Sequence, residues 1–106
     1  MVMRPKHKFS ATRTTKDNVS FASKLEADYY DKLKLLKKVG KVLFFLRQVP
    51  LHLGDGKSKY VVDFVEFWSN GEVRFVDVKG FETAEFKLKK KLVESLYPIE
   101  IEIVKK

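Results

Sequence analysis

The chain has 106 residues, 44% of them hydrophobic and 13% aromatic, which is enough for one folded domain and too few for two. It contains no cysteine, which excludes disulfides, a thiolate metal site and a cysteine nucleophile. No apolar run approaches the ~18 residues of a membrane span and there is no signal-peptide core, so we expect a cytoplasmic protein without a membrane partner. The 22 Lys and Arg exceed the 14 Asp and Glu, and the resulting charge of +8 favours a nucleic-acid partner.

Residues 1–20 show no hydrophobic period and predict a flexible basic arm outside a single domain over residues 21–106. The candidate phosphate contacts of this arm are Arg4, Lys6, Lys8 and Arg13. The alternative is that these side chains are simply solvated.

The first ordered element is expected to be a helix over residues 23–39. Ser23-Lys24-Leu25-Glu26 has the form of a capping box, in which the Ser and Glu side chains satisfy free backbone donors. Apolar side chains then recur at helical spacing, and Gly40 marks the end. The apolar positions are Leu25, Tyr29, Leu33 and Leu36.

Three strands are expected next. Residues 41–49 are rich in β-formers and predict a strand that ends at Pro50, followed by an exposed loop over 51–58. Residues 59–81 then predict two strands joined by a tight turn.

Thr83 is a candidate N-cap for a second helix over residues 84–97, with Pro98 at its end. Its polar side carries Lys87, Lys90 and Lys91, which are candidate phosphate contacts or a solvated face. Residues 99–103 alternate Ile with Glu, the period of a half-buried strand. The predicted fold is therefore α/β, in the order α-β-β-β-α-β.

The turn between the two central strands decides whether Asp63 and Asp77 lie together. A two-residue loop over 70–71 would place the acids on opposite faces. A three-residue Ser69-Asn70-Gly71 loop makes paired residue numbers sum to 140 and matches opposite charges and like hydrophobes. We predict the second register, which pairs Asp63 with Asp77, Glu66 with Arg74 and Phe64 with Val76.

In this register two carboxylates face each other, with Lys79 two residues along the same face. Like charges at this distance are unfavourable unless one is protonated or a cation lies between them. Carboxylate oxygens suit Mg²⁺ or Mn²⁺, which could bind a scissile phosphate, while Lys79 could orient a water or stabilise developing charge. The alternative is that these are strand-end charges paired with Lys or Arg.

Asp63 followed by Asp77-Val78-Lys79 resembles the D…(D/E)-x-K signature of the PD-(D/E)XK nuclease superfamily, although Val62 replaces the nominal Pro. The element order is similar to that superfamily's restriction-endonuclease-like core, a mixed sheet flanked by helices. The likeness extends to a small phage-encoded branch that is similar in core to Holliday-junction resolvases. It covers roughly residues 21–104, through residues 21–27, 48–50, 63–64, 77–81 and 86–91.

The resemblance implies that Glu26 is a further acid of the metal site, although Glu26 could instead be only the capping-box acid. It also implies a metal-dependent DNA endonuclease acting on branched or junction DNA in phage DNA metabolism, in the host cytoplasm. A homodimer would supply two sites for such a substrate. The alternatives are a non-catalytic nucleic-acid-binding module with structural acids, and a protein-interaction subunit of a phage replication complex.

Overall fold

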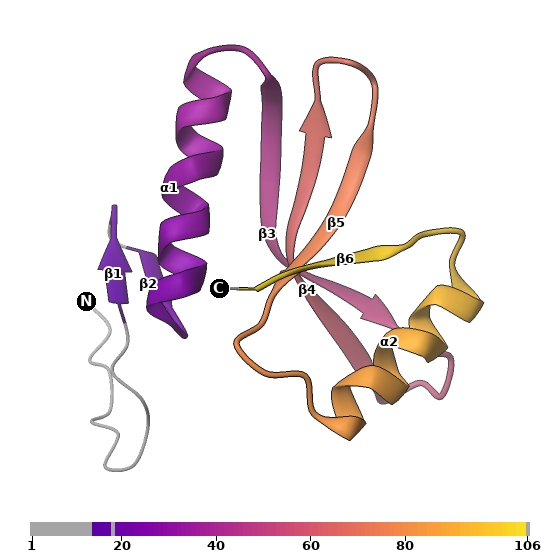
Figure 1. Cartoon of the computed structure of the whole chain (residues 1–106). Coiled ribbons are helices and arrows are strands. Elements are labelled where there is room, and N and C mark those ends of the chain that lie inside the picture. The colour runs from indigo at the N-terminus through magenta and orange to yellow at the C-terminus, as the bar shows by residue number, and fades with distance from the viewer. Residues whose placement is uncertain (1–13, 18, 106) are drawn as a thin grey trace.

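The computed structural model describes residues 14–17 and 19–105, so the arm residues Arg4, Lys6, Lys8 and Arg13 lie outside the described part. The predicted α/β class is confirmed, and so is the order α-β-β-β-α-β from the first helix onward. An additional hairpin precedes it (Figure 1). The elements are β1 (Thr14–Lys16), β2 (Val19–Phe21), α1 (Lys24–Lys38), β3 (Val42–His52), β4 (Lys59–Trp68), β5 (Val73–Val78), α2 (Ala84–Leu96) and β6 (Ile101–Val104).

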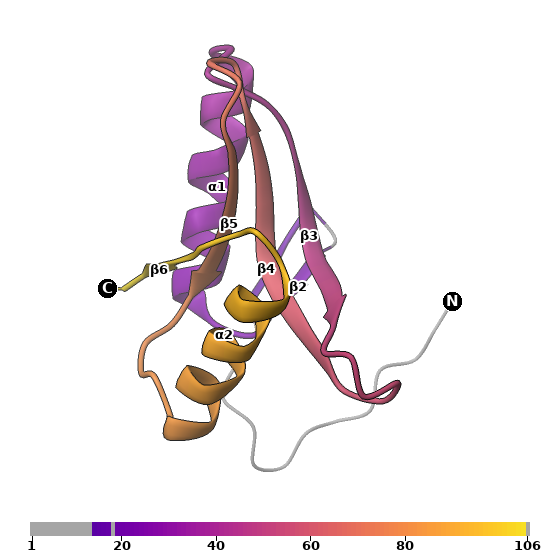
Figure 2. The ribbon, with the colours of Figure 1, turned by 90° about the vertical axis from the view of Figure 1, so that its right-hand side faces the viewer.

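The main sheet is mixed, with strand order β3-β4-β5-β6 and one parallel pair, β5 with β6. Helix α1 lies beside one end of the sheet and α2 beside the other (Figures 1 and 2). Two groups of buried side chains pack the two helices against the sheet. The α1 cluster contains Phe21, Ala27, Leu33, Val42, Phe64, Val76 and Val78, and the α2 cluster contains Leu53, Tyr60, Val62, Val65, Val93 and Ile101.

The hairpin of β1 and β2 corrects the expected boundary between arm and domain, because residues 14–17 and 19–20 belong to ordered structure. The two strands pair antiparallel with Thr15 opposite Ser20. Phe21, at the end of β2, is fully buried in the α1 cluster and so fixes the hairpin to the domain. Strands of three residues are too short to give a recognisable hydrophobic period.

The end of β3 was predicted wrongly, since the strand continues through Pro50 to His52. Pro50 pairs with Val61 of β4. Because β3 is an edge strand, a residue without an N–H group is tolerated there.

The two helices begin at the predicted caps. Ser23 Oγ accepts a hydrogen bond from Glu26 N at 3.1 Å, and Thr83 Oγ1 accepts one from Phe86 N at 3.0 Å. These contacts satisfy one free backbone donor at each helix start.

The predicted three-residue loop is confirmed. Glu66 lies opposite Arg74 and Phe64 opposite Val76, and Trp68 N donates to Glu72 O at 2.9 Å to close the loop. Gly71 has a φ of 93°, the left-handed conformation that this loop requires at its last position.

Candidate functional site

In the register of β3 with β4, Gln48 falls opposite Asp63, between the pairs Arg47–Phe64 and Val49–Val62. Gln48 has a φ of 51°, which non-glycine residues rarely adopt within a strand. Alternate strand residues normally share a face, yet Val62 packs in the α2 cluster and Phe64 in the α1 cluster. One face of β4 therefore packs in the α2 cluster before Asp63 and in the α1 cluster after it.

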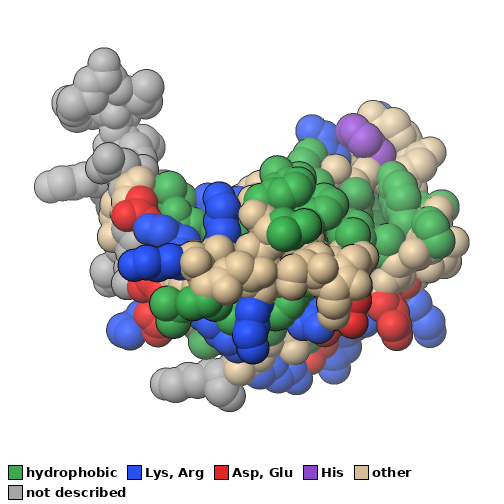
Figure 3. Space-filling model, turned by 90° about the horizontal axis from the view of Figure 1, so that it is seen from above, with side chains coloured by type: hydrophobic (Ala, Val, Ile, Leu, Met, Phe, Trp, Pro, Cys, Tyr) green, Lys and Arg blue, Asp and Glu red, His purple; other side chains and the backbone are tan. Residues whose placement is uncertain are grey.

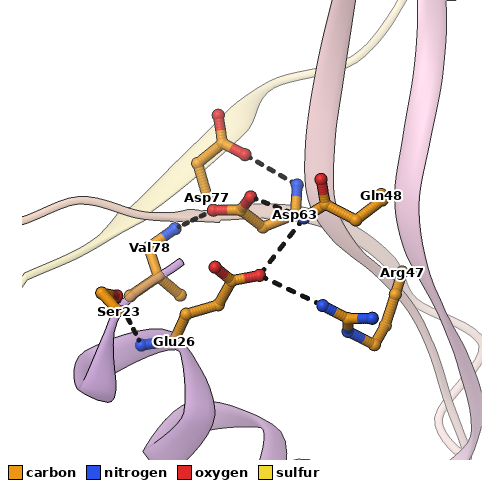
Figure 4. Close-up of polar contacts among 7 residues, drawn as sticks. All are labelled: Ser23, Glu26, Arg47, Gln48, Asp63, Asp77 and Val78. Carbon is orange, nitrogen blue, oxygen red and sulfur yellow. Dashed lines mark hydrogen bonds and ion pairs between the residues drawn. The ribbon is translucent and has the colours of Figure 1, made fainter. Parts of the chain in front are cut away.

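Asp63 and Asp77 come together here, as the register predicts, although regular pairing of β4 with β5 stops at Phe64–Val76. The side chains continue the connection (Figure 4). Asp63 N donates to Asp77 Oδ1, and Val78 N donates to Asp63 Oδ2, both at 2.9 Å. The two carboxylates thus replace carbonyl acceptors where the strands separate.

Glu26 reaches the same place from the first turn of α1, and its side chain is only 5% exposed. Its Oε2 accepts hydrogen bonds from Gln48 Nε2 at 3.2 Å and Arg47 Nη2 at 3.4 Å. The carboxylate therefore faces β3, while the backbone of Glu26 takes part in the cap. The Ser23 half of the predicted capping box is therefore formed, whereas the carboxylate of Glu26 binds the side chains of β3.

Gln48 links two of the acids, because its Nε2 also donates to Asp63 Oδ1 at 3.1 Å. One amide group therefore lies between the carboxylates of Glu26 and Asp63 (Figure 4). No site role for Gln48 is predicted from the sequence. The available signal was a polar amide in a mostly apolar strand, at the start of the resembling stretch over residues 48–50.

Arg47 is a second residue whose part in the site the sequence did not reveal. Its guanidinium lies 4.3 Å from the centroid of the Phe21 ring and contacts Glu26. Its Nε is buried without a hydrogen-bond partner in the described part of the chain. The Phe21 ring thus packs against the Arg47 guanidinium, which contacts the Glu26 carboxylate.

Burial raises the pKa of Glu26 above its usual value, and repulsion from Asp63 raises it further, while Arg47 opposes the shift. Burial likewise raises the pKa of Asp77, which is 1% exposed, although its hydrogen bond from Tyr60 opposes this. Both acids are therefore held in surroundings that disfavour their charge, as at sites that bind cations.

Lys79 lies beside Asp77 and shares with it a pocket of about 250 Å³. Its Nζ is 4.7 Å from the centroid of the Phe86 ring on α2. Two further lysines line this pocket, Lys59 at the start of β4 and Lys89 on α2. Three cations from three segments thus line the pocket with two acids, Asp77 and Glu85, and Lys89 pairs with Glu85 at 3.3 Å.

The lysines predicted to contact phosphate lie elsewhere on α2. Lys87 and Lys91 are exposed, and Lys90 forms an ion pair with Glu94 at 3.0 Å. None of the three lines the pocket with Asp77, whereas Lys89 does.

The acids do not form a ready-made metal cluster. Within residues 14–17 and 19–105, no three His, Asp or Glu side chains are gathered closely enough to hold an ion. Glu26 lines a separate hollow of about 150 Å³ with Arg47 and Gln48, while Asp77 lines the larger pocket. Asp63 lies between them, within hydrogen-bond reach of both sides.

Replacing Gln48 with Gly should destabilise the protein by about 1.5–3 kcal/mol at neutral pH, because a donor to two carboxylates is lost. Glycine fits the positive φ, so the backbone is not strained. The pKa of Glu26 is already raised, so its contribution to stability is present below its usual value of 4.5 and falls as pH rises. Without Gln48 the free energy of unfolding should fall more steeply as pH rises.

Urea unfolding in EDTA at pH 4.5 and pH 7.5 measures the effect. Gln48→Ala is the matched variant, expected to be less stable than Gln48→Gly because it adds strain at the same φ. An equal loss at both pH values would contradict the proposed contact with ionised carboxylates.

The fold and site together define a small α/β protein with a mixed sheet. Its acids Glu26, Asp63 and Asp77 lie near the point where regular pairing of β4 with β5 ends. The chain belongs to the family DUF1064, described as "Protein of unknown function", whose family model matches residues 6–105. No curated protein and no solved structure matches the chain significantly. Among the described residues, no helix is long and apolar enough to cross a membrane.

Proposed function

We propose that this protein is a metal-dependent deoxyribonuclease of the PD-(D/E)XK type. The observation that carries the proposal is the convergence of Glu26 from α1 and Asp63 from β4 on one amide group, Gln48 Nε2, at 3.2 and 3.1 Å. Two carboxylates this close favour a cation between them. Asp77 adjoins Asp63 through the bond from Asp63 N.

The donor set fits Mg²⁺ or Mn²⁺, which prefer carboxylate and amide oxygens. Glu26, Asp63 and Asp77 would hold the ion. The carboxylates keep free lone pairs beyond the hydrogen bonds that they accept. Such an ion would polarise a phosphoryl oxygen of the substrate and lower the pKa of a bound water.

The chain's own groups supply positioning and charge. Lys79, beside Asp77, would orient the attacking water or stabilise negative charge developing on the phosphate. Lys59 and Lys89 line the same pocket; Lys59 would bind a neighbouring phosphate, and Lys89 would do so by exchanging its ion pair with Glu85 for one with the phosphate. Arg47 offsets the repulsion between the acids through its contact with Glu26.

DNA is the proposed substrate because the chain carries a net charge of +8. The described domain is too small to read a long base sequence, which favours a substrate recognised by shape, such as branched or junction DNA. A homodimer would present two sites to such a substrate. The expected location is the cytoplasm of a phage-infected host.

A non-catalytic nucleic-acid-binding module is the second candidate, and a specific observation favours it. Asp77 accepts hydrogen bonds from Tyr60 and from the backbone of Asp63, and Asp63 accepts one from Val78 N. These contacts join the strands where regular pairing ends. The acids would then be structural, and the basic surface alone would bind DNA.

Cleavage of a four-way junction and of supercoiled plasmid in Mg²⁺ or Mn²⁺ tests the proposal. We expect the wild type to cut and EDTA to abolish cutting. Asp63→Asn and Asp77→Asn should each lower the rate about 100-fold or more, the scale of losing a group that organises transition-state charge.

Asp28→Asn is the control, because Asp28 is an exposed acid of α1 that pairs with Lys24 one turn away. It should cut at the wild-type rate, and circular dichroism should show that all variants fold. Cleavage that persists in both site variants would remove the proposed site. Binding without cleavage by the wild type would favour the module.

A further inference from the structure

We propose a second nucleic-acid-binding site along the seam between α1 and β3, which holds a single-stranded DNA segment leading to the acidic site. The inference deepens the proposed function, on which it rests for DNA as the ligand. The seam is formed by Tyr30, Lys34, Lys37 and Lys38 of α1 with Phe45 of β3.

The helical positions of the seam lie on one side of α1. Tyr30 follows Glu26 by four residues, Lys34 follows Tyr30 by four, and Lys37 and Lys38 come one turn later. Residues at this spacing form a continuous stripe. At 1.5 Å per residue the stripe spans about 18 Å from Glu26 to Lys38, which is enough for a few nucleotides of a single strand.

The residues of the seam enclose a concavity of about 420 Å³. The rings of Tyr30 and Phe45 meet edge to face with centroids 5.8 Å apart, and Lys34 Nζ lies 5.6 Å from the Tyr30 centroid. Aromatic rings next to lysines are the combination with which proteins hold single strands, because bases stack on the rings while phosphates meet the cations.

The charge of the seam is concentrated at the end of α1. Lys34 is paired with Asp17 and lies near Asp31, so its charge is largely offset. Lys37 and Lys38 are exposed in the last turn. Seen from above, Lys and Arg side chains gather beside hydrophobic ones at the side of the molecule where α1 lies (Figure 3).

The seam is continuous with the acidic site through Arg47. Its guanidinium lies 5.9 Å from the Tyr30 centroid and contacts Glu26 Oε2 at 3.4 Å. A strand lying along the lysines and over Tyr30 would therefore arrive at Glu26. A duplex buries the faces of its bases, so the aromatic part of the seam favours an unpaired segment, as found beside a branch.

Fluorescence anisotropy with a labelled twelve-residue oligothymidine in EDTA tests the seam without metal or cleavage. Tyr30→Leu should weaken binding about tenfold or more, and Tyr30→Phe, which keeps the ring, should restore it. The double variant Lys37→Ala/Lys38→Ala should make the log–log salt slope shallower by about 1.4, since each lost contact to a single strand contributes about 0.7.

The double variant Lys24→Ala/Lys57→Ala removes the same charge from exposed positions off the seam and should keep the wild-type slope. An equal change of the salt slope in both double variants would overturn the proposal that the seam binds DNA. Unchanged affinity in Tyr30→Leu would overturn it as well. If the wild type binds through the seam but never cuts, the nuclease proposal fails while the seam stands.

Discussion

Replacing Lys79 with Ala should slow metal-dependent DNA cleavage by about 100-fold or more while leaving the fold intact. Lys79 lines the pocket that holds Asp77 and is the cation of the D-x-K arrangement. Its loss removes a positive charge from the side of the phosphate. DNA affinity in EDTA should fall much less, because other lysines of the pocket remain.

Single-turnover cleavage of a junction substrate measures this effect, with Lys57→Ala as the control. Lys57 lies in the exposed loop between β3 and β4, where its backbone N–H donates to Asp55. Lys79→Met keeps an unbranched apolar side chain at this position and loses the Nζ that lies over the Phe86 ring, so it separates loss of charge from loss of packing. If Lys79→Met cuts at the wild-type rate, Lys79 has no role in the chemistry.

Replacing Phe64 with Ala should destabilise the protein by about 3–5 kcal/mol, the usual cost of truncating a buried Phe. Phe64 is fully buried in the α1 cluster. Its ring lies 5.3 Å from the Tyr29 centroid and 6.1 Å from the Phe45 centroid. A domain of this size has about 5–15 kcal/mol in total, so a large part of its stability would be lost.

Urea unfolding followed by tryptophan fluorescence measures the change, since Trp68 packs on the same cluster. Phe64→Leu should cost less, because it leaves a smaller cavity at the same position. Val73→Ala, at a half-exposed position of β5, should cost under about 1 kcal/mol. A loss below about 1 kcal/mol for Phe64→Ala would contradict its place at the centre of the core.

Local signals in the sequence were sufficient for most elements of the fold. Ser23 and Thr83 are placed at helix starts by the chemistry of free backbone donors, which depends on a few neighbouring residues. The register of the hairpin likewise followed from matching charges and hydrophobes across one turn. That register alone is enough to predict that Asp63 and Asp77 lie next to each other.

Signals that depend on distant neighbours were missed. Pro50 is tolerated only because β3 has a free edge, and the hairpin before α1 is held by the burial of Phe21. The left-handed conformation of Gln48 has no counterpart in its local sequence, since glutamine does not favour a positive φ. Each of these features depends on what the rest of the chain places beside it.

The sequence by itself determined the α/β class, the order of elements from α1 onward, and the pairing that sets Asp63 near Asp77. The resemblance suggested that Glu26 joins them. Only the tertiary structure decided that Glu26 and Asp63 share the amide of Gln48, and that Arg47 contacts Glu26. The reason is physical: caps and turns are set within a few residues, whereas burial and the approach of like charges depend on how α1 packs against β3 and β4.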